Sequence, residues 1–474
     1  MNDAAPRLAA LAETLLGAPL PVRIRAWDGS EAGPPTGPVL VFRRRRAVRR
    51  MLWKPGELGL ARAWVAGDLT VDGDLFELLD RVAGLVWEKG HELPPTALPA
   101  PAGPAGKRVG RIGRIGPRAA LGAVADRARE ARPAALPEAA RLLRDPERRA
   151  AVRGLIALAG PLPPPAPPAE EATARRGGPQ HSKGRDRRAV SHHYDVGNEF
   201  YERVLGPSMV YSCAYWTPGG TLEAAQRDKL DLVCRKLALR PGDRLLDVGC
   251  GWGSMAVHAA REYGVRVTGV TLSREQAAYA LKRVADEGLT DLVEIRIQDY
   301  RDVKDGPYDA VSSIGMAEHV GAERYQEYAR TLHALLRPGG RLLNHQIARP
   351  PEPDEDAYRI DAFIDAYVFP DGELSPLGST VGELERAGFE VRDVEALREH
   401  YGLTLRAWVA RLETHWEECA RLTSPGRARV WQLYMAACAL GFERGRLGVN
   451  QVLAVRSSAT GESGLPLRLR TWTE

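Results

Sequence analysis

The stretch Leu245-Leu246-Asp247-Val248-Gly249-Cys250-Gly251-Trp252-Gly253 decides the fold. A short apolar run that meets an acid and then gives Gly-x-Gly-x-Gly predicts a buried strand, a tight turn and a helix, the geometry of a nucleotide-binding crevice. Glycine lets the backbone approach a ligand where a Cβ would collide. A dinucleotide site needs Gly-x-Gly-x-x-Gly, so this spacing departs from that fingerprint by one residue.

Strand-like and helix-like segments alternate around this stretch. The alternation predicts an α/β fold with a parallel sheet covered by helices on both faces. The expected strands are 244–248, 265–273, 293–302, 308–320 and 341–348, the last preceded by a glycine turn at 339–340. Residues 354–380 interrupt the pattern with an aromatic-rich segment that is well placed to be a lid. A strand at 389–397, helices at 404–420 and 425–443, and a last strand at 449–456 are expected to follow.

The chain has 474 residues, which is too long for one ordinary core. Strand and helix patterns near the N-terminus predict a small α+β domain over residues 1–95. Residues 96–184 are rich in Pro, Ala and Arg and predict a linker that includes Ala-rich helices. Residues 185–474 then form the large α/β domain.

Basic charge is concentrated in one part of the chain. The net charge is only +5, but residues 100–190 hold 19 Lys and Arg against 8 Asp and Glu. A run of four arginines at 43–46 adds a second basic patch. Such patches are commonly solvated faces, and they also suit lipid phosphates. No helix-turn-helix, RNA-binding aromatic pair or zinc finger accompanies them, so we expect no nucleic-acid partner.

Five widely spaced cysteines without a Cys-x-x-Cys pair argue against a disulfide framework and against a zinc site. They favour a reducing, cytoplasmic compartment. No 18-residue apolar run and no signal peptide is present, so contact with the inner face of the membrane would be peripheral. The histidines have no spacing that suits a metal, and we expect no metal site.

Several separate motifs together resemble one known family. The Gly-x-Gly-x-Gly loop is similar to motif I of the class I S-adenosylmethionine methyltransferases. Beyond that loop, the chain resembles the cyclopropane-fatty-acyl-phospholipid synthases over about residues 185–456, and the N-terminal lipid-binding module of the bacterial enzymes more weakly over 22–90. The motifs are HHYDVGNEFY, MVYSCAYW, LLDVGCGWGS, GVTLSREQ, IGMAEHVG, HQI and FIDAYVFPDGEL. The resemblance implies a Rossmann-like class I methyltransferase fold that binds S-adenosylmethionine.

The resemblance also implies which residues contact that cofactor. The methionine end would meet the loop that begins at Asp247, the ribose would meet the segment after the second strand, and the adenine would meet the end of the third strand. An acid that many methyltransferases place after the second strand is absent here, as in this family. The implied cofactor residues are Tyr211, Ser212, Asp247, Gly249, Cys250, Gly251, Gly253, Thr271, Leu272, Ser273, Gln276, Gln298 and Asp299.

The family chemistry requires a base near the transferred methyl group. Attack of an isolated alkene on the sulfonium methyl leaves a carbocation, and ring closure then removes a proton from the added methyl. The resemblance implies a bound bicarbonate as that base, held by Cys213, Glu318, His345, Tyr401 and the backbone near Ile347. Taken singly, Cys213 could be a small core residue, His345 a satisfied core histidine and Tyr401 a packing aromatic.

We expect an enzyme that transfers a methyl(ene) group to the double bond of unsaturated phospholipid acyl chains at the membrane surface, forming a cyclopropane. A 10-methylene chain, the precursor of a 10-methyl branch, is nearly as well supported and would need a separate reductase. A small-molecule N-methyltransferase and a non-catalytic lipid-binding protein are weaker readings. The sequence leaves the oligomeric state open, a homodimer included.

Overall fold

The computed structural model describes residues 3–89, 145–160, 163, 165–171, 182–186, 196–355, 358, 360–370, 372–468 and 470. The chain folds into two compact units. The small unit comprises Met1–Leu52 and Leu69–Pro164, and the large unit comprises Trp53–Asp68 and Pro165–Glu474. The expected linker falls mostly outside the described residues, which resume at residue 145.

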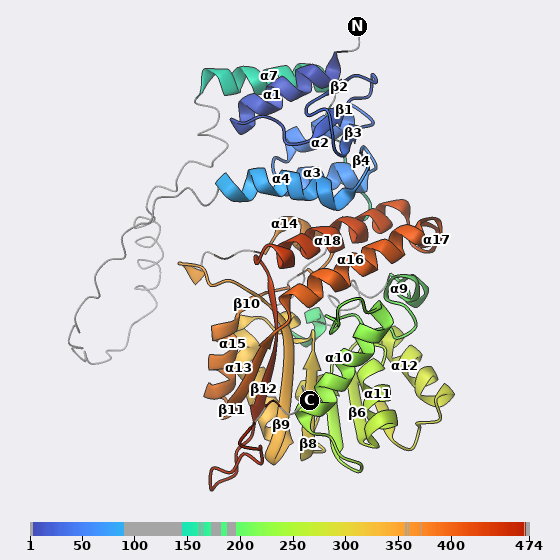
Figure 1. Ribbon diagram of the computed structural model, residues 1–474, viewed down its shortest axis with the longest axis vertical. Helices are drawn as coiled ribbons and strands as arrows, with labels where there is room; N and C mark the ends of the chain where they lie inside the picture. Colours follow the sequence, from blue (N-terminus) through green and yellow to red (C-terminus); the bar gives the residue numbers. More distant parts are fainter. Residues whose placement is uncertain are drawn as a thin grey trace, which may run out of the picture. The chain divides into compact units, whose positions relative to one another are not determined.

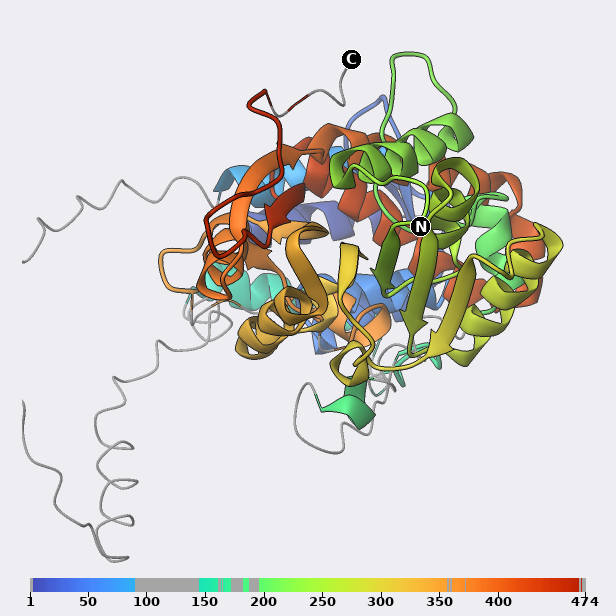
Figure 2. The ribbon, with the colours of Figure 1, turned by 90° about the horizontal axis from the view of Figure 1, so that it is seen from below.

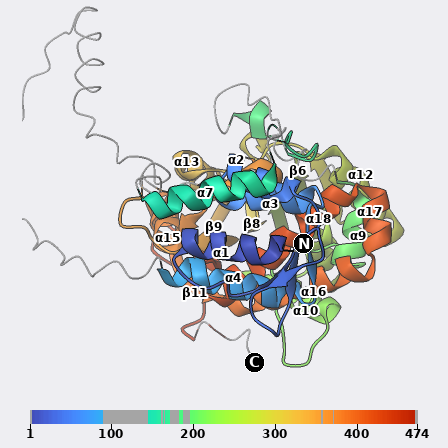
Figure 3. The same ribbon diagram turned by 90° about the horizontal axis from the view of Figure 1, so that it is seen from above.

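Among its described residues, the small unit combines a four-stranded sheet with four helices. The sheet order is β2-β1-β3-β4, with β1 and β3 parallel and the outer pairs antiparallel. Helices α1 and α7 lie side by side (Figure 3). Helix α7 falls within the segment expected as linker, and the carboxylate of Asp145 caps it by accepting a hydrogen bond from the Glu147 N–H at 2.9 Å. The elements are α1 Ala4–Leu16, β1 Arg23–Arg25, β2 Glu31–Ala32, β3 Val39–Phe42, α2 Arg46–Trp53, β4 Leu69–Asp72, α4 Leu75–Lys89 and α7 Pro146–Ala159.

The large unit is built on one mostly parallel sheet (Figure 1). Its order is β11-β12-β9-β8-β5-β6-β7, with β10 paired to β9. The five strands predicted around the glycine loop are parallel, as expected, whereas β12 is antiparallel to both β9 and β11. The strands are β5 Arg244–Val248, β6 Arg266–Thr271, β7 Val293–Ile297, β8 Tyr308–Ile314, β9 Leu336–Arg349, β10 Ser375–Pro376, β11 Glu390–Ala396 and β12 Gly448–Val455.

Helices cover both faces of this sheet, as Figure 2 shows. On one face α10, α11 and α12 bury Leu230, Met255 and Ala280 against the strands. On the other face α13 and α15 bury Leu332 and Leu384. The helical elements are α3 Glu57–Val65, α9 Asn198–Leu205, α10 Leu222–Leu237, α11 Ser254–Tyr263, α12 Arg274–Asp286, η1 Tyr300–Asp302, η2 Ala317–His319, α13 Ala322–Leu335, α14 Ala362–Tyr367, α15 Leu377–Arg386, α16 Arg398–Thr414, α17 Trp416–Leu422 and α18 Pro425–Glu443.

Strand β9 is longer than the sequence predicts. The expected glycine turn at 339–340 lies inside the strand, where the pairing with β8 shifts between Tyr308 and Ala310. The glycines therefore form an irregularity within the strand. The chain at the end of β12 pairs with it, because the Gly339 N–H donates to the carbonyl of Arg456 at 2.6 Å. The strand continues without a break to the carboxyl edge of the sheet.

The large unit also includes a segment from the N-terminal part of the chain. Residues Trp53–Asp68 group with it because α3 packs against α18. Trp64 Nε1 donates a hydrogen bond to the carbonyl of Arg429 at 3.0 Å, and Arg62 forms an ion pair with Glu171. This division differs from a continuous small domain over residues 1–95. Among the described residues, no helix has the length and apolar character to cross a membrane.

Candidate active site

The glycine loop forms the turn between β5 and α11 as predicted. Gly249 and Cys250 both donate their N–H groups to the carbonyl of Val270 on β6. Gly253 has φ +78°, and a Cβ built on it would lie 3.0 Å from the Cβ of Ala280. The third glycine is thus required both by its backbone conformation and by the close approach of α12.

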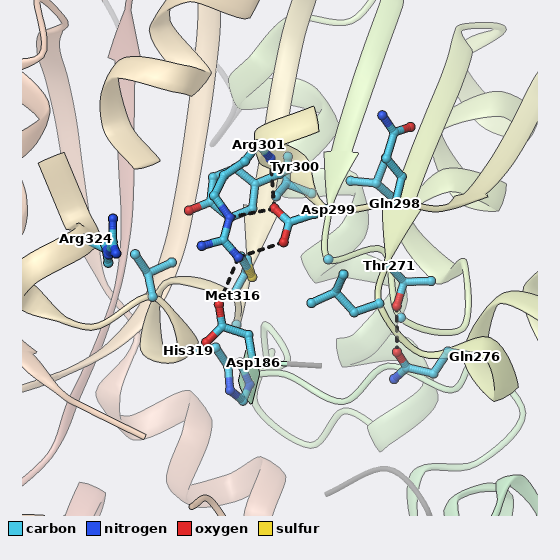
Figure 4. A pocket seen from close by; sticks show the side chains of 17 residues that line it. Asp186, Thr271, Gln276, Gln298, Asp299, Tyr300, Arg301, Met316, His319 and Arg324 are labelled. Carbon is cyan, nitrogen blue, oxygen red and sulfur yellow. Dashed lines mark hydrogen bonds and ion pairs between the residues drawn. The ribbon is translucent and has the colours of Figure 1, made fainter. Parts of the chain in front are cut away.

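A pocket opens at the carboxyl edge of β5, β6 and β8, where ligands bind in open α/β sheets (Figure 4). Seven of the expected cofactor residues line it, namely Gly249, Gly251, Thr271, Leu272, Gln276, Gln298 and Asp299. The other six expected cofactor residues do not line this pocket, namely Tyr211, Ser212, Asp247, Cys250, Gly253 and Ser273.

Thr271, Ser273 and Gln276 shape the part of the pocket beyond β6. Thr271 Oγ1 donates to Gln276 Oε1 at 3.1 Å, which orients the amide. Ser273 instead caps α12, because its hydroxyl accepts from the Gln276 N–H at 3.2 Å. The Gln276 side chain is therefore held at the pocket wall, while Ser273 holds the helix that carries it.

Asp247 is buried behind the glycine loop. Its Oδ1 accepts a hydrogen bond from Ser312 Oγ at 2.7 Å, and its Oδ2 has no hydrogen-bond partner among the described residues. Burial raises the pKa of Asp247 to about 6, although Ser312 and the positive charge of Lys229 act against that rise. The carboxylate oxygen without a partner is an acceptor for a cationic group of a ligand.

Arg301 and Asp186 line the pocket although the sequence did not single them out. Arg301 forms two hydrogen bonds to the carboxylate of Asp299, at 2.7 and 2.8 Å, and another to Asp186 at 2.9 Å (Figure 4). Burial would raise the pKa of Asp299, but the hydrogen bonds from Arg301 outweigh it and hold that pKa below its usual value. The fork fixes Asp299 as an oriented acceptor at the end of β7.

Glu318 lies on the short helix η2 after β8 and is half-buried, with its Oε2 atom shielded from solvent. Its Oε1 accepts a hydrogen bond from the Ile347 N–H at 2.8 Å. Its Oε2 is buried with no hydrogen-bond partner in the described structure. Burial raises the pKa of Glu318 to about 7, against the lowering effect of the Ile347 N–H. At neutral pH this carboxyl group can therefore either donate or accept a proton.

His345 lies two residues before Ile347 on β9 and is 2% exposed. Neither ring nitrogen has a hydrogen-bond partner among the described residues. Burial, and then the positive charges of Lys229 and Lys236, hold the pKa of His345 well below its usual value. The imidazole is therefore neutral, with one N–H donor and one acceptor free for a ligand.

Cys213 and Tyr401 are connected to these residues through Leu397. Cys213 Sγ lies 3.6 Å from the carbonyl of Leu397, which also accepts the Tyr401 N–H at 3.1 Å. Leu397 N–H in turn donates to Val449, and Val449 pairs with Ile347 across β12 and β9. These contacts link Cys213 and Tyr401 through Leu397 and Val449 to Ile347, whose N–H binds Glu318. Burial raises the pKa of the Cys213 thiol, which stays protonated.

Helix α16 begins earlier than the sequence predicts. The expected helix at 404–420 starts at Arg398, ends at Thr414 and is followed by α17. Tyr401 therefore lies within the first turns of α16, where its ring packs 4.7 Å from that of Phe442. The helix starts earlier because the Trp216 N–H donates to His400 Nδ1 and the Ala214 N–H donates to Thr404 Oγ1. No local sequence pattern reveals these contacts.

The segment expected as a lid is attached to the backbone of Glu318. Glu373 N–H donates to the carbonyl of Glu318 at 3.1 Å, and the Glu373 carboxylate accepts from the Ala322 N–H at 3.0 Å. Asp361 caps α14 in the same segment. A movement of this segment would thus act directly on η2. In the part of the chain that the structure describes, no cluster of three or more His, Cys, Asp or Glu could hold a metal ion.

A family model described as mycolic acid cyclopropane synthetase matches residues 181–452. The chain belongs to this family. A probable fatty acid methyltransferase of Mycobacterium tuberculosis is 41% identical to it over 458 residues, with 94% of each chain covered. The cyclopropane-fatty-acyl-phospholipid synthase of Escherichia coli is 39% identical over 269 residues, which are 57% of this chain and 68% of that protein.

The large unit is also similar to solved structures of the family. Mycolic acid cyclopropane synthase CmaA1, in complex with SAH and CTAB, matches with 34% identity and a TM-score of 0.53, over 56% of this chain and 97% of that one. The cyclopropane synthase MmaA2 of Mycobacterium tuberculosis matches with 31% identity and a TM-score of 0.54, over the same shares. The chain is an S-adenosylmethionine-dependent C-methyltransferase of the cyclopropane synthase type, with the expected class I fold.

Proposed function

We propose that the chain transfers a methyl(ene) group from S-adenosylmethionine to the double bond of an unsaturated phospholipid acyl chain and forms a cyclopropane. One observation carries the proposal. Glu318 and His345 present buried polar atoms without hydrogen-bond partners beside the Ile347 N–H. Buried polar atoms are rarely left unsatisfied, so these atoms favour a small polar ligand enclosed next to the cofactor pocket.

The chemistry of this donor set fits bicarbonate. A neutral His345 and a protonated Glu318 can each donate a hydrogen bond to an anion, and the Tyr401 hydroxyl is a third candidate donor. Bicarbonate bound there would supply the base that the ring closure needs. Glu318 would orient it, while Cys213, whose thiol stays protonated, would contribute packing and the backbone around it.

The residues that line the pocket, together with Asp247 behind the glycine loop, fit S-adenosylmethionine, which supplies the electrophilic methyl group. Asp247 would accept from its α-amino group through the Oδ2 atom that has no partner. Gln276 and Asp299 would bind the ribose and the adenine from the pocket wall. The buried His345 ring and the shielded Oε2 atom of Glu318 would help to exclude water from the carbocation, which water would otherwise trap as an alcohol.

A 10-methylene acyl chain is the second candidate product. The relatives are named both as fatty acid methyltransferases and as cyclopropane synthases, and the same residues would serve both outcomes. A hydride shift before proton loss would give the methylene product, which a separate reductase would then convert to a methyl branch. A small-molecule N-methyltransferase is disfavoured because it would have no use for the enclosed Glu318 and His345 pair.

The proposal extends to peripheral contact with the cytoplasmic face of the membrane. Its support is the basic run at 43–46 and the excess of cations over residues 100–190. Each cation near an anionic surface contributes about 1 kcal/mol.

Mass spectrometry of lipids tests the reaction. Purified protein, S-adenosylmethionine and vesicles of monounsaturated phosphatidylethanolamine should give acyl chains heavier by about 14 daltons, the mass of one CH₂ unit. A product that resists catalytic hydrogenation is the cyclopropane, whereas one that takes up hydrogen is the methylene chain. If no unsaturated chain gains mass while S-adenosylhomocysteine still binds, the lipid proposal fails and the cofactor site stands.

A further inference from the structure

Lys229 on α10 is a buried cation that the proposed reaction has not used. It is 1% exposed. Its Nζ donates a hydrogen bond to Ser212 Oγ at 2.9 Å. Among the described residues, no carboxylate lies within ion-pair distance of this ammonium group. A fully buried ammonium with one neutral partner is costly, so the site gains something from its charge.

Lys236, two turns further along α10, provides the contrast. It is equally buried, but its ammonium forms an ion pair with Glu395 and a hydrogen bond to Gln451 at 2.8 Å. Lys236 is thus compensated in the ordinary way, because its charge meets a carboxylate. The two lysines on this helix therefore differ in their partners, because only Lys236 meets a carboxylate. An ion pair explains the buried charge of Lys236 but not that of Lys229.

The hydrogen bond of Lys229 reaches the segment Tyr211–Cys213, which holds residues expected at the cofactor and at the anion. Ser212, which it holds, follows Tyr211 among the expected cofactor residues. Cys213, the next residue, is tied to the carbonyl of Leu397 beside the catalytic group. The bond at Ser212 therefore fixes the position of this segment relative to both the cofactor and the proposed anion.

We propose that Lys229 is a positioning residue, whose charged ammonium holds Ser212 and supplies the positive charge between Asp247 and His345. This inference rests on the proposed function. The titratable groups that face Lys229 come from each element around it, namely Cys213, Cys234 on α10, Asp247 on β5, His258 on α11 and His345 on β9.

The electrostatic effects of Lys229 on Asp247 and on His345 agree with this role. The charge of Lys229 lowers the pKa of Asp247 and so favours the carboxylate that a cationic ligand group needs. It also lowers the pKa of His345 and so keeps the imidazole neutral. Burial lowers the pKa of Lys229 itself to about 8. Its charge is therefore mostly present at pH 7 and is lost as the pH rises through about 8.

Lys229→Met tests the inference, because methionine keeps the length of the side chain and removes its charge. We expect KM for S-adenosylmethionine to rise and kcat to fall. Together these changes should lower kcat/KM roughly 10- to 100-fold. We also expect the melting temperature to stay equal to or above that of the wild type, since a buried charge without a carboxylate has been removed. Lys236→Met is the matched control, and it should lose melting temperature because Glu395 is left without its cation.

The pH profile separates positioning by charge from simple packing. Glu318 titrates near pH 7 in all the variants, so the difference between them is the readout. Between pH 7 and 9.5 wild-type kcat/KM should fall more steeply than that of Lys229→Met, and Lys229→Arg should retain more activity than the wild type at high pH because its charge persists. Lys229→Met with wild-type kcat/KM would overturn the inference, as would an alkaline fall that is the same in all three proteins. Binding of S-adenosylhomocysteine by calorimetry needs no lipid, so a missing lipid product would count against the proposed function and leave the test of Lys229 intact.

Discussion

Replacing Glu318 by glutamine should change how the stability of the protein depends on pH. The glutamine amide keeps the acceptor for the Ile347 N–H, which lies 2.8 Å from Oε1 in the wild type. It removes the ionisable group whose pKa burial raises from 4.5 to about 7. Fold and site shape should therefore persist, while one buried titration disappears.

The sign and size of the effect follow from proton linkage. A carboxyl group with a raised pKa holds its proton in the folded state after the unfolded chain has lost it. Its contribution to stability is therefore present below about pH 4.5 and is lost as the pH rises through about 7. Between pH 5.5 and 8 the free energy of unfolding of the wild type should fall by ~2 kcal/mol, the equivalent of about 1.4 pKa units. The free energy of unfolding of Glu318→Gln should not show this fall.

Scanning calorimetry can measure this difference. A change of ~2 kcal/mol corresponds to a shift of roughly 3 °C in melting temperature for a unit of this size. The melting temperature of Glu318→Gln relative to the wild type should rise by that amount between pH 5.5 and 8. The exposed Glu323 provides the matched control, since Glu323→Gln removes a carboxylate of the same size from the surface. Parallel pH profiles for Glu318→Gln and the wild type would refute the burial argument.

Three further variants test the cofactor pocket. Asp247→Asn keeps a partner for Ser312 but loses the buried carboxylate, and calorimetry should show at least a roughly tenfold weaker binding of S-adenosylhomocysteine with an unchanged fold. Gly253→Ala should destabilise the protein by about 1–3 kcal/mol in thermal melts, because φ is positive and the added Cβ is crowded, whereas Gly378→Ala has open space and should be neutral or stabilising. Arg301→Met should release Asp299 and raise KM for S-adenosylmethionine about tenfold with little change in kcat, and equal effects on both parameters would contradict a purely cofactor-side role.

The sequence predicted the sheet well because its signals are local. An apolar strand, an acid and three glycines lie within nine residues, so the turn at Gly249 could be derived from steric arguments alone. The carboxyl edge of β8 likewise placed Glu318 near ligands. Its hydrogen bond to Ile347 could not be derived, because Ile347 lies 29 residues later on another strand.

The remaining differences arise from contacts between distant segments. Arg301 was not predicted, because the sequence does not distinguish a surface arginine from a pocket arginine. Only the structure shows that Arg301 binds Asp186 and Asp299. Lys229 was missed for the same reason, since helix periodicity shows that it is buried only when the partner faces are known. The catalytic roles came from family resemblance and remain proposals, although the structure brings Cys213 and Tyr401 together through Leu397.

The segment Trp53–Asp68 has a consequence for how the protein is made. Trp64 bonds to Arg429, which is 365 residues later in the chain. At about 5–20 residues per second, the ribosome needs on the order of tens of seconds to deliver that partner. During this interval α3 lacks α18, the helix against which it packs in the folded chain. Nascent chains should therefore be vulnerable to proteases and dependent on chaperones at this segment until synthesis is nearly complete.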